Sequence, residues 1–159
     1  MDTQIWLGLL LSFLPVFEIR GGLPLIADYV LREGLSIWPY FFMALTLNIL
    51  VIFLIFLFLD FLHDSFMNLK IYRHFIGKVL KRMHKKAKKV ENRFEKFEYL
   101  SLVLFVAIPL PGTGAWTGAL VSWILGLNRW KSFIAIAFGV TIAGFLVLLL
   151  SLGFFNWFY

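Results

Sequence analysis

Two short stretches rich in proline and glycine decide how this chain folds. They read Glu18-Ile19-Arg20-Gly21-Gly22-Leu23-Pro24 and Pro109-Leu110-Pro111-Gly112-Thr113-Gly114. The first ends an apolar block at residues 3–17, and the second lies inside a charge-free block at residues 99–128. Proline removes a backbone donor and clashes with the preceding helical turn, and glycine adds backbone freedom. We therefore expect each block to form two short helical pieces, joined by a non-helical bend.

The composition indicates a membrane protein. Of the 159 residues, 61% are hydrophobic and 15% are charged, whereas soluble domains average about 45–50% and about 25%. Residues 36–59 and 132–159 carry no charge, and each is long enough to cross a hydrocarbon core about 30 Å thick. The sequence therefore predicts transmembrane helices at residues 36–62 and 131–156.

The positive charge is concentrated in one segment. Residues 63–98 hold 11 of the 15 Lys and Arg with four acidic residues, a net charge of +7. Short basic loops stay in the cytoplasm, which favours a membrane-protein loop over a nucleic-acid-binding segment. Apolar residues recur every three or four positions from Ile71 to Phe97, which predicts a basic amphipathic helix over residues 66–98. Such a helix either lies on an anionic membrane surface or packs on its own protein.

The two halves of the chain correspond when the sequence is shifted by 92 residues. Six identities fall in the window 13–38, among them Gly22 with Gly114, Gly34 with Gly126 and Trp38 with Trp130. Both halves show the same order of apolar block, Pro/Gly stretch, Gly-Leu and long span. This pattern predicts an inverted repeat of a helical hairpin and a transmembrane helix, with hairpins at residues 4–34 and 99–127.

The hairpins have two possible topologies. They are either re-entrant, entering and leaving on one side of the membrane, or they are broken helices that cross it. Re-entrant hairpins put Arg129 and Lys131 on the cytoplasmic side, as the positive-inside rule prefers. The predicted fold is therefore an all-α integral membrane protein in which a basic amphipathic cytoplasmic helix joins the two repeats.

The first stretch carries the candidate charges. Transporters with inverted repeats bind substrates at interrupted helices near the midplane, and ionisable groups at that depth are functional candidates. Arg20, the amides of Gly21 and Gly22, and a helix starting near Leu23 would suit an anion such as phosphate. Glu18 could accept a coupling proton. The alternative is an internal Glu18–Arg20 ion pair that only holds the bend.

The second stretch has no charge. Carbonyls, amides and one hydroxyl there complete the predicted substrate site, from Pro109, Pro111, Gly112, Thr113 and Gly114, with a second helix starting near Ala115. The alternative is a turn that permits tight packing, because small residues recur every four positions from Gly114 to Gly126.

Few other residues are candidates for a chemical role. Asn48 and Thr141, near the middle of the two spans, are expected to hydrogen-bond between helices. The chain has no cysteine, its histidines show no metal-ligand spacing, and no catalytic motif is present. We therefore expect no enzyme activity, metal or cofactor.

The paired stretches resemble a known family. Residues 18–27, Glu-Ile-Arg-Gly-Gly-Leu-Pro-Leu-Ile-Ala, and residues 109–116, Pro-Leu-Pro-Gly-Thr-Gly-Ala-Trp, look like the two signatures of the prokaryotic small multidrug export protein family. More distantly, the layout resembles the DedA/VTT superfamily, whose members carry two facing re-entrant hairpins and are linked to lipid scrambling or polyprenyl-phosphate recycling. That superfamily usually carries arginines in its second motif. This chain has none there, so only Arg20 could contact a phosphate.

Three functions are compatible with these features. The first is a transporter or flippase of an amphiphilic, anionic lipid-like substrate, coupled to protons through Glu18. The second is a small multidrug exporter of lipophilic cations, in which Glu18 binds the drug and Arg20 opposes it. The third is a non-transporting membrane scaffold that recruits partners through its basic helix.

The sequence also predicts the cellular location, the partners and the assembly of the protein. We expect a multi-pass protein of the prokaryotic plasma membrane, with the loop 63–98 in the cytoplasm. Its partners would be membrane lipids and the lipid-like substrate, and not nucleic acid. Two spans and two hairpins enclose little volume, so a homodimer or larger assembly is expected.

Overall fold

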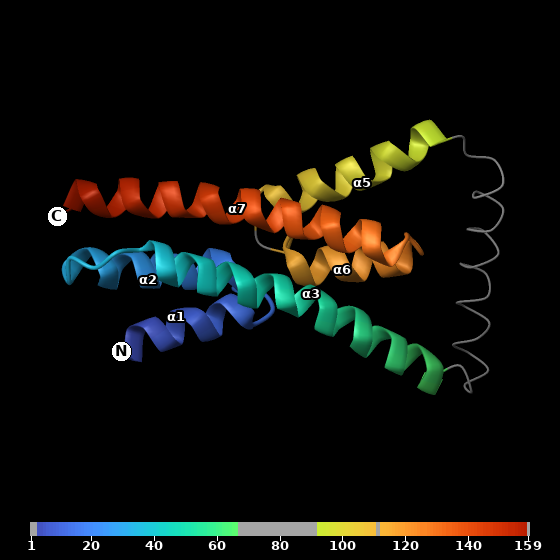
Figure 1. Ribbon diagram of the computed structural model, residues 1–159, viewed down its shortest axis with the longest axis horizontal. Helices are drawn as coiled ribbons and strands as arrows, with labels where there is room; N and C mark the ends of the chain where they lie inside the picture. The colour runs from blue at the N-terminus through green and yellow to red at the C-terminus, as the bar shows by residue number, and fades with distance from the viewer. Residues whose placement is uncertain (1–2, 67–91, 111, 159) are drawn as a thin grey trace.

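The computed structural model describes residues 3–66, 92–110 and 112–158. These ranges contain no strand, in agreement with the all-α prediction. The chain order of the helices is shown in Figure 1 and reads α1 (Thr3–Phe13), α2 (Glu18–Arg32), α3 (Trp38–Phe66), α5 (Asn92–Ala107), α6 (Ala115–Ile124) and α7 (Arg129–Phe158).

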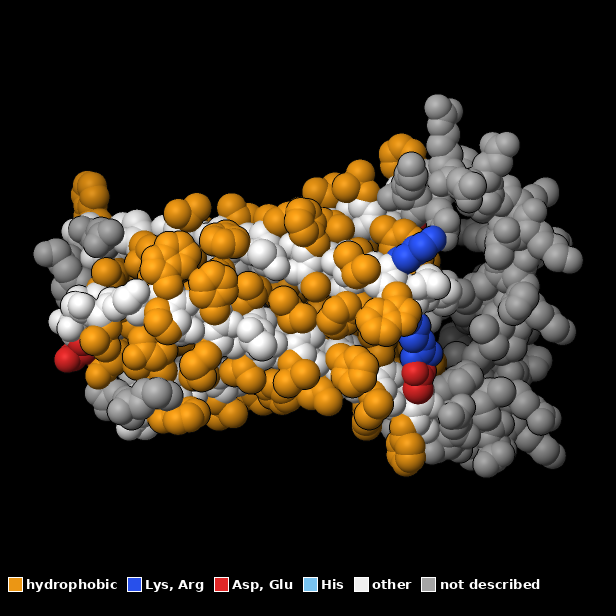
Figure 2. Space-filling model, viewed as in Figure 1, with side chains coloured by type: hydrophobic (Ala, Val, Ile, Leu, Met, Phe, Trp, Pro, Cys, Tyr) orange, Lys and Arg blue, Asp and Glu red, His pale blue; other side chains and the backbone are white. Residues whose placement is uncertain are grey.

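Two of the helices are long and apolar. The segments Trp38–Phe61 of α3 and Arg129–Phe155 of α7 are long and apolar enough to cross a membrane. They coincide with the two predicted spans to within a few residues. Figure 2 shows hydrophobic side chains along the length of the visible face, with the coloured charges confined to its two ends. This distribution suits a protein surrounded by hydrocarbon.

Helices α1 and α2 form a hairpin. α1 runs from one end of the molecule to its middle, and α2 returns to the same end (Figure 1). The Gln4 side chain at the start of α1 donates to Leu25 O at 3.1 Å and to Asp28 at 3.0 Å, in the second half of α2. Near the bend the two helices are so close that a Cβ at Gly22 would lie 2.1 Å from Gly8 O.

The first bend lies earlier than the sequence predicted. Residues 18–24 were expected to be non-helical, but α2 begins at Glu18 and continues through Pro24. The prediction of a helix start near Leu23 is therefore wrong. A proline inside a membrane helix removes only one donor, and neighbouring helices can compensate for the loss. Pro24 therefore does not interrupt α2.

The first bend covers residues 14–17. Pro15 sits at its centre, where it has no N–H to donate and disfavours a helical backbone at Leu14. Val16 has φ 77° and Glu18 has φ 50°, both in the left-handed region. A β-branched residue with positive φ, such as Val16, is strained.

Helices α5 and α6 form the second hairpin. α5 ends at Ala107 and α6 begins at Ala115, so the second bend lies where the sequence predicted it, over residues 108–114. Gly112 has φ 81°, which glycine adopts readily. The Tyr99 hydroxyl accepts a hydrogen bond from Asn128 N at 3.1 Å, which brings the chain after α6 back beside α5.

The predicted amphipathic helix is only partly described. Its residues 67–91 lie outside the described ranges. α5 begins at Asn92 and continues without a break past residue 98 to Ala107. The end of the predicted amphipathic helix at residue 98 therefore does not coincide with a helix end.

The two hairpins end in the same kind of turn, 92 residues apart. Gly34 and Gly126 both have φ 64°. The next residue in each case bonds back into the helix, from Leu35 N to Val30 O at 2.9 Å and from Leu127 N to Ser122 O at 3.0 Å. This is the Schellman motif. The starts of α2 and α6 are not in this register, so the inverted repeat remains a prediction.

Charged residues mark the two ends of the molecule. At one end Arg32 bonds to Asp28 at 2.9 Å within α2. At the other end Arg129, the first residue of α7, forms an ion pair with Asp60 near the end of α3. The turn between α6 and α7 therefore lies at the end where α3 leads into the basic segment 63–98.

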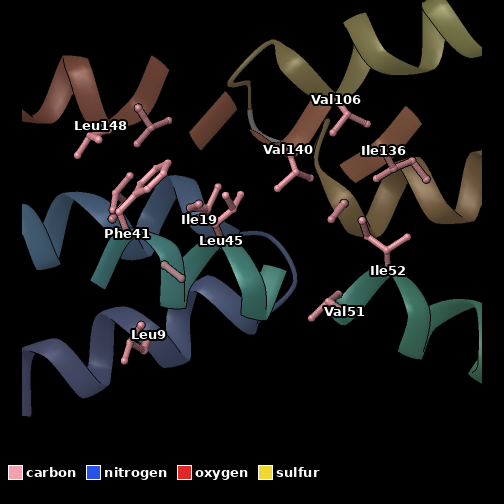
Figure 3. Packing of buried hydrophobic residues seen from close by; sticks show 14 of the residues in the cluster. Leu9, Ile19, Phe41, Leu45, Val51, Ile52, Val106, Ile136, Val140 and Leu148 are labelled. Atoms are coloured by element: carbon pink, nitrogen blue, oxygen red, sulfur yellow. The ribbon is translucent and has the colours of Figure 1, made fainter. Parts of the chain in front are cut away.

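The hydrophobic core lies between the long helices and the hairpins. Side chains of α3 such as Phe41 and Ile52 face those of α7 such as Ile136 and Val140, with Ile19 of α2 among them (Figure 3). Small residues let helices approach. A Cβ at Gly139 of α7 would lie 2.8 Å from Val106 Cβ of α5. Gly139 of α7 therefore packs against α5 inside the chain.

We predict that Gly139→Ala destabilises the protein. The added methyl would lie 2.9 Å from Val103 O, so α5 and α7 must separate, and such overpacking lowers the free energy of unfolding by about 1–3 kcal/mol. Thermal unfolding in detergent measures the effect. Gly153→Ala is the matched control on the same helix, because nothing lies within 4 Å of its Cβ position. Equal unfolding temperatures for the two variants would contradict this packing.

Candidate functional site

The bends of the two hairpins meet halfway along the spans. Asn48, near the middle of the span Trp38–Phe61, donates to Ser12 O at the end of α1 at 2.8 Å. Gly144, near the middle of α7, faces Ile19, whose Cδ1 would lie 3.1 Å from a Cβ at that glycine. The bends are therefore at mid-depth if α3 and α7 cross the bilayer.

Glu18 caps the N-terminus of α6. Its side chain is buried, with 5% of its surface exposed. One carboxylate oxygen accepts from Ala115 N at 3.2 Å and the other from Trp116 N at 3.1 Å. Carboxylates are stabilised at helix N-termini by unpaired amides and by the helix dipole. A Cβ at Gly114 would lie 1.5 Å from Oε2 of Glu18, so the contact requires glycine there.

Arg20 binds the C-terminal end of α5 and the bend that follows it. Its Nη2 donates to Val106 O at 2.9 Å and to Thr113 O at 3.2 Å. Its Nη1 donates to Leu110 O and to Thr113 Oγ1, the latter at 3.1 Å. Helix C-termini carry partial negative charge and free carbonyls, which suit a guanidinium. Arg20 therefore caps the end of α5 and the second bend.

Glu18 and Arg20 do not form the internal ion pair that was the alternative for the first stretch. Among the described residues, Arg32 pairs with Asp28 and Arg129 pairs with Asp60. Glu18 and Arg20 lie two positions apart on α2, and each binds a different end of the broken α5–α6 helix. Glu18 and Arg20 of the first hairpin thus both bind the second hairpin.

The last carbonyls of α1 have partners from outside the first hairpin. Trp116 Nε1 donates to Phe13 O at 3.2 Å, and Asn48 supplies the bond to Ser12 O. The interhelical bond expected of Asn48 is confirmed. The one expected of Thr141 is wrong, because its hydroxyl bonds to Ala137 O within α7 at 2.8 Å.

The remaining predicted site residues lie in different places. Pro109, Gly112, Thr113 and Gly114 belong to the second bend, and Pro111 lies outside the described residues. Thr113 Oγ1 is 2.8 Å from Ile108 O and so also closes the bend. Gly21 and Gly22 are inside α2, where Gly22 serves the packing on α1.

Trp116 is a residue that sequence reasoning did not assign to the site. It lies in the run that resembles the family signature, but tryptophan at a helix start is most often an interfacial anchor. Trp116 reaches the site only because the tertiary fold brings the two bends together, which the sequence alone does not show.

Two buried polar atoms remain unpaired at the bends. Arg20 Nε and Asn48 Oδ1 have no hydrogen-bond partner. Buried polar groups are normally paired, so each unpaired atom is a place where water or a ligand can bind. No group of three or more His, Asp or Glu side chains suited to a metal occurs within residues 3–66, 92–110 and 112–158.

We predict that Glu18→Gln lowers the stability of the protein. The amide retains one acceptor for the two N–H groups of α6 and loses the charge, and an unsatisfied buried donor lowers the free energy of unfolding by about 1–3 kcal/mol. The exposed Glu33 provides the matched control, Glu33→Gln. Thermal unfolding in detergent should separate the two variants, and equal midpoints would show that the cap contributes nothing.

Comparison with known proteins gives one match. The family model described as "putative small multi-drug export protein" matches residues 18–146, about four-fifths of the chain. No curated protein and no solved structure matches. The resemblance to the DedA/VTT superfamily therefore stays a prediction. The match begins at Glu18, directly after the first bend, and includes Glu18, Arg20 and the second bend that they bind. The two long apolar helices agree with a membrane exporter. The chain belongs to the small multidrug export protein family.

Proposed function

We propose that this protein exports small lipophilic cations across the membrane, with Glu18 as the substrate-binding group. The observation that carries the proposal is the buried Glu18 carboxylate, held at mid-depth by the amides of a broken helix. An ionisable group at that depth and interrupted helices are features of transporters. The family description supports an exporter and names no enzyme activity.

The proposed topology is a pair of re-entrant hairpins that enter from opposite sides. It is supported by the ion pair of Arg129 with Asp60, which keeps the α6–α7 turn beside the exit of α3. A broken crossing helix would carry Arg129 to the opposite side. With the basic segment 63–98 in the cytoplasm of a prokaryotic cell, Arg129 then also lies on the cytoplasmic side.

The contacts of Arg20 weaken the main objection to a cationic substrate. A free guanidinium beside Glu18 would repel a cation. Four acceptors at the end of α5 and in the second bend surround this guanidinium and offset its charge.

An anionic headgroup finds fewer open donors. The amides of Ala115 and Trp116 are occupied by Glu18, and both terminal nitrogens of Arg20 are occupied by the second bend. Apart from Arg20 Nε, which has no partner, an anion would have to displace the carboxylate of Glu18 or the second bend to reach a donor. The geometry therefore supports the cation better than the anionic lipid that the sequence favoured, and the family description gives no support to lipid transport.

The cap suggests how binding would be coupled to movement. A cation that pairs with Glu18 competes with the amides of α6 for the same carboxylate. Protonation of Glu18 would likewise weaken its bonds to those amides. Either event would loosen the first hairpin from the second, so that substrate and proton binding are alternatives at one group.

We predict that Glu18→Gln strongly reduces transport of a lipophilic cation. Tetraphenylphosphonium uptake into proteoliposomes measures the rate, with the exposed variant Glu33→Gln as control. The rate should fall by about tenfold or more, because each loss of about 1.4 kcal/mol of binding is a factor of about ten. Glu33→Gln should transport like the wild type.

Three results would contradict the proposal. Wild-type rates in Glu18→Gln would exclude Glu18 as the binding group. Binding of a polyprenyl phosphate that is lost in Arg20→Leu would instead favour the anionic-lipid function. Absence of cation binding by the folded wild type would favour a non-transporting scaffold.

A further inference from the structure

One donor of the Arg20 guanidinium is left without a partner. An arginine side chain carries five N–H groups, of which four are on the two terminal nitrogens and one is on Nε. The terminal nitrogens make four hydrogen bonds to the end of α5 and the second bend, with Val106 O, Leu110 O, Thr113 O and Thr113 Oγ1. The N–H of Nε is buried and has no partner among the described residues. Arg20 therefore holds the second bend with its terminal nitrogens and keeps one charged donor unused.

The unused donor makes the empty protein less stable than it could be. A buried donor without an acceptor is unfavourable, and more so when the donor is charged. The described part of the chain has three buried side-chain atoms without a partner, namely Arg20 Nε, Asn48 Oδ1 and Ser132 Oγ. Of these, only Arg20 Nε belongs to a charged group. A ligand that brings an acceptor to Nε would form a bond that the protein alone does not make.

This donor lies close to the proposed cation-binding group. Arg20 Nη2 binds Thr113 O, and Glu18 binds Ala115 N, two positions further along the chain. Residues two positions apart have Cα atoms no more than about 7.6 Å from each other. A carboxylate can accept about four hydrogen bonds, and Glu18 accepts two from the amides of α6. One small ligand can therefore reach both Glu18 and Arg20.

A ligand reaches Nε when the two hairpins loosen. The atom is covered in the structure, and the bonds of Glu18 to α6 hold the hairpins together beside it. A cation that competes for Glu18 would weaken those bonds and uncover Nε. A ligand shifts a conformational equilibrium by the difference in its affinity for the two states. A bond to Nε is available only in the loosened state, so it would favour that state.

We infer that Arg20 Nε selects the substrate, and that the preferred substrates are lipophilic ammonium compounds with an oxygen acceptor close to the charged nitrogen. The ammonium group binds Glu18, and an ester, ether or hydroxyl oxygen accepts from the N–H of Nε. The negative end of that oxygen's dipole faces the guanidinium and reduces the repulsion between the two cations. This role of Arg20 rests on the proposed function of Glu18 and adds a substrate class to it.

Two probes of equal charge and similar length test the role of the oxygen. Benzoylcholine and (4-phenylbutyl)trimethylammonium have the same number of chain atoms between the phenyl ring and the quaternary nitrogen, and only benzoylcholine carries an ester. Isothermal titration calorimetry on the wild-type protein in detergent should show about tenfold tighter binding of benzoylcholine, the effect of one hydrogen bond to a charged donor. Equal affinities, or tighter binding of the oxygen-free probe, would overturn the role of Arg20 Nε.

The Nε–H signal of Arg20 shows whether the bond forms at this atom. Correlation spectra of 15N and 1H resolve arginine Nε–H groups, and Arg20→Lys identifies the signal by its absence. If that variant does not fold, the same replacement at each other arginine identifies the signal by elimination. Benzoylcholine should shift the Nε–H proton downfield and slow its exchange with water, whereas the oxygen-free probe should do neither. A signal that benzoylcholine leaves unchanged, as when water occupies the donor, would overturn the inference.

Glu18→Gln separates this inference from the proposed function. If both probes bind the wild type equally and both bind Glu18→Gln weakly, Glu18 binds the cation and only the role of Arg20 Nε is wrong. Glu33→Gln, which changes an exposed carboxylate, is the control and should bind both probes like the wild type. If neither probe binds the folded wild type, the proposed function and the role of Arg20 Nε are both wrong.

Discussion

A broken helix inside hydrocarbon must find partners for its free backbone groups, and this requirement organises the molecule. The second hairpin breaks between Ala107 and Ala115, which frees carbonyls at the end of α5 and amides at the start of α6. Glu18 binds the amides and Arg20 binds the carbonyls. Each charge lies at the helix end whose dipole favours it, so two ionisable groups stay at mid-depth without a direct ion pair.

The other features of the centre follow from these contacts. Gly114 is required because any side chain there would occupy the position of the Glu18 carboxylate. Gly22, four positions after Glu18 and two after Arg20, lets α1 and α2 pack closely. Trp116, in the second hairpin, donates a hydrogen bond from its indole N–H to Phe13 O at the end of α1. A substrate that competes for Glu18 would act on the contact that holds the two hairpins together, and this links the proposed binding event to a change in packing.

The local features of the fold could be predicted from the sequence, whereas the long-range contacts could not. The two spans, the second bend and the start of α6 near Ala115 follow from charge-free length and from the Pro/Gly run. The sequence predicts the first bend at residues 18–24, whereas it lies at residues 14–17, where Pro15 disfavours a helix. The glycines of residues 18–24 suggest a turn, but Gly22 serves helix packing. The capping bonds could not be predicted, since Glu18 and Trp116 are 98 positions apart and a carboxylate in a sequence does not show which helix end it will reach. Residues 67–91 lie outside the described structure, so over these residues the basic amphipathic helix stays a prediction.

The central claim is that the Glu18 carboxylate binds the first amides of α6 in the membrane. Solid-state NMR can measure this contact in lipid bilayers, with 13C in the glutamate carboxyl carbons and 15N in the tryptophan backbone. Glu18→Asp and Glu18→Gln identify the signal. The account predicts strong dipolar dephasing between the Glu18 carboxyl carbon and Trp116 N, as a 3.1 Å hydrogen bond requires. A Glu18 carboxyl signal with no dephasing from tryptophan nitrogen would contradict it.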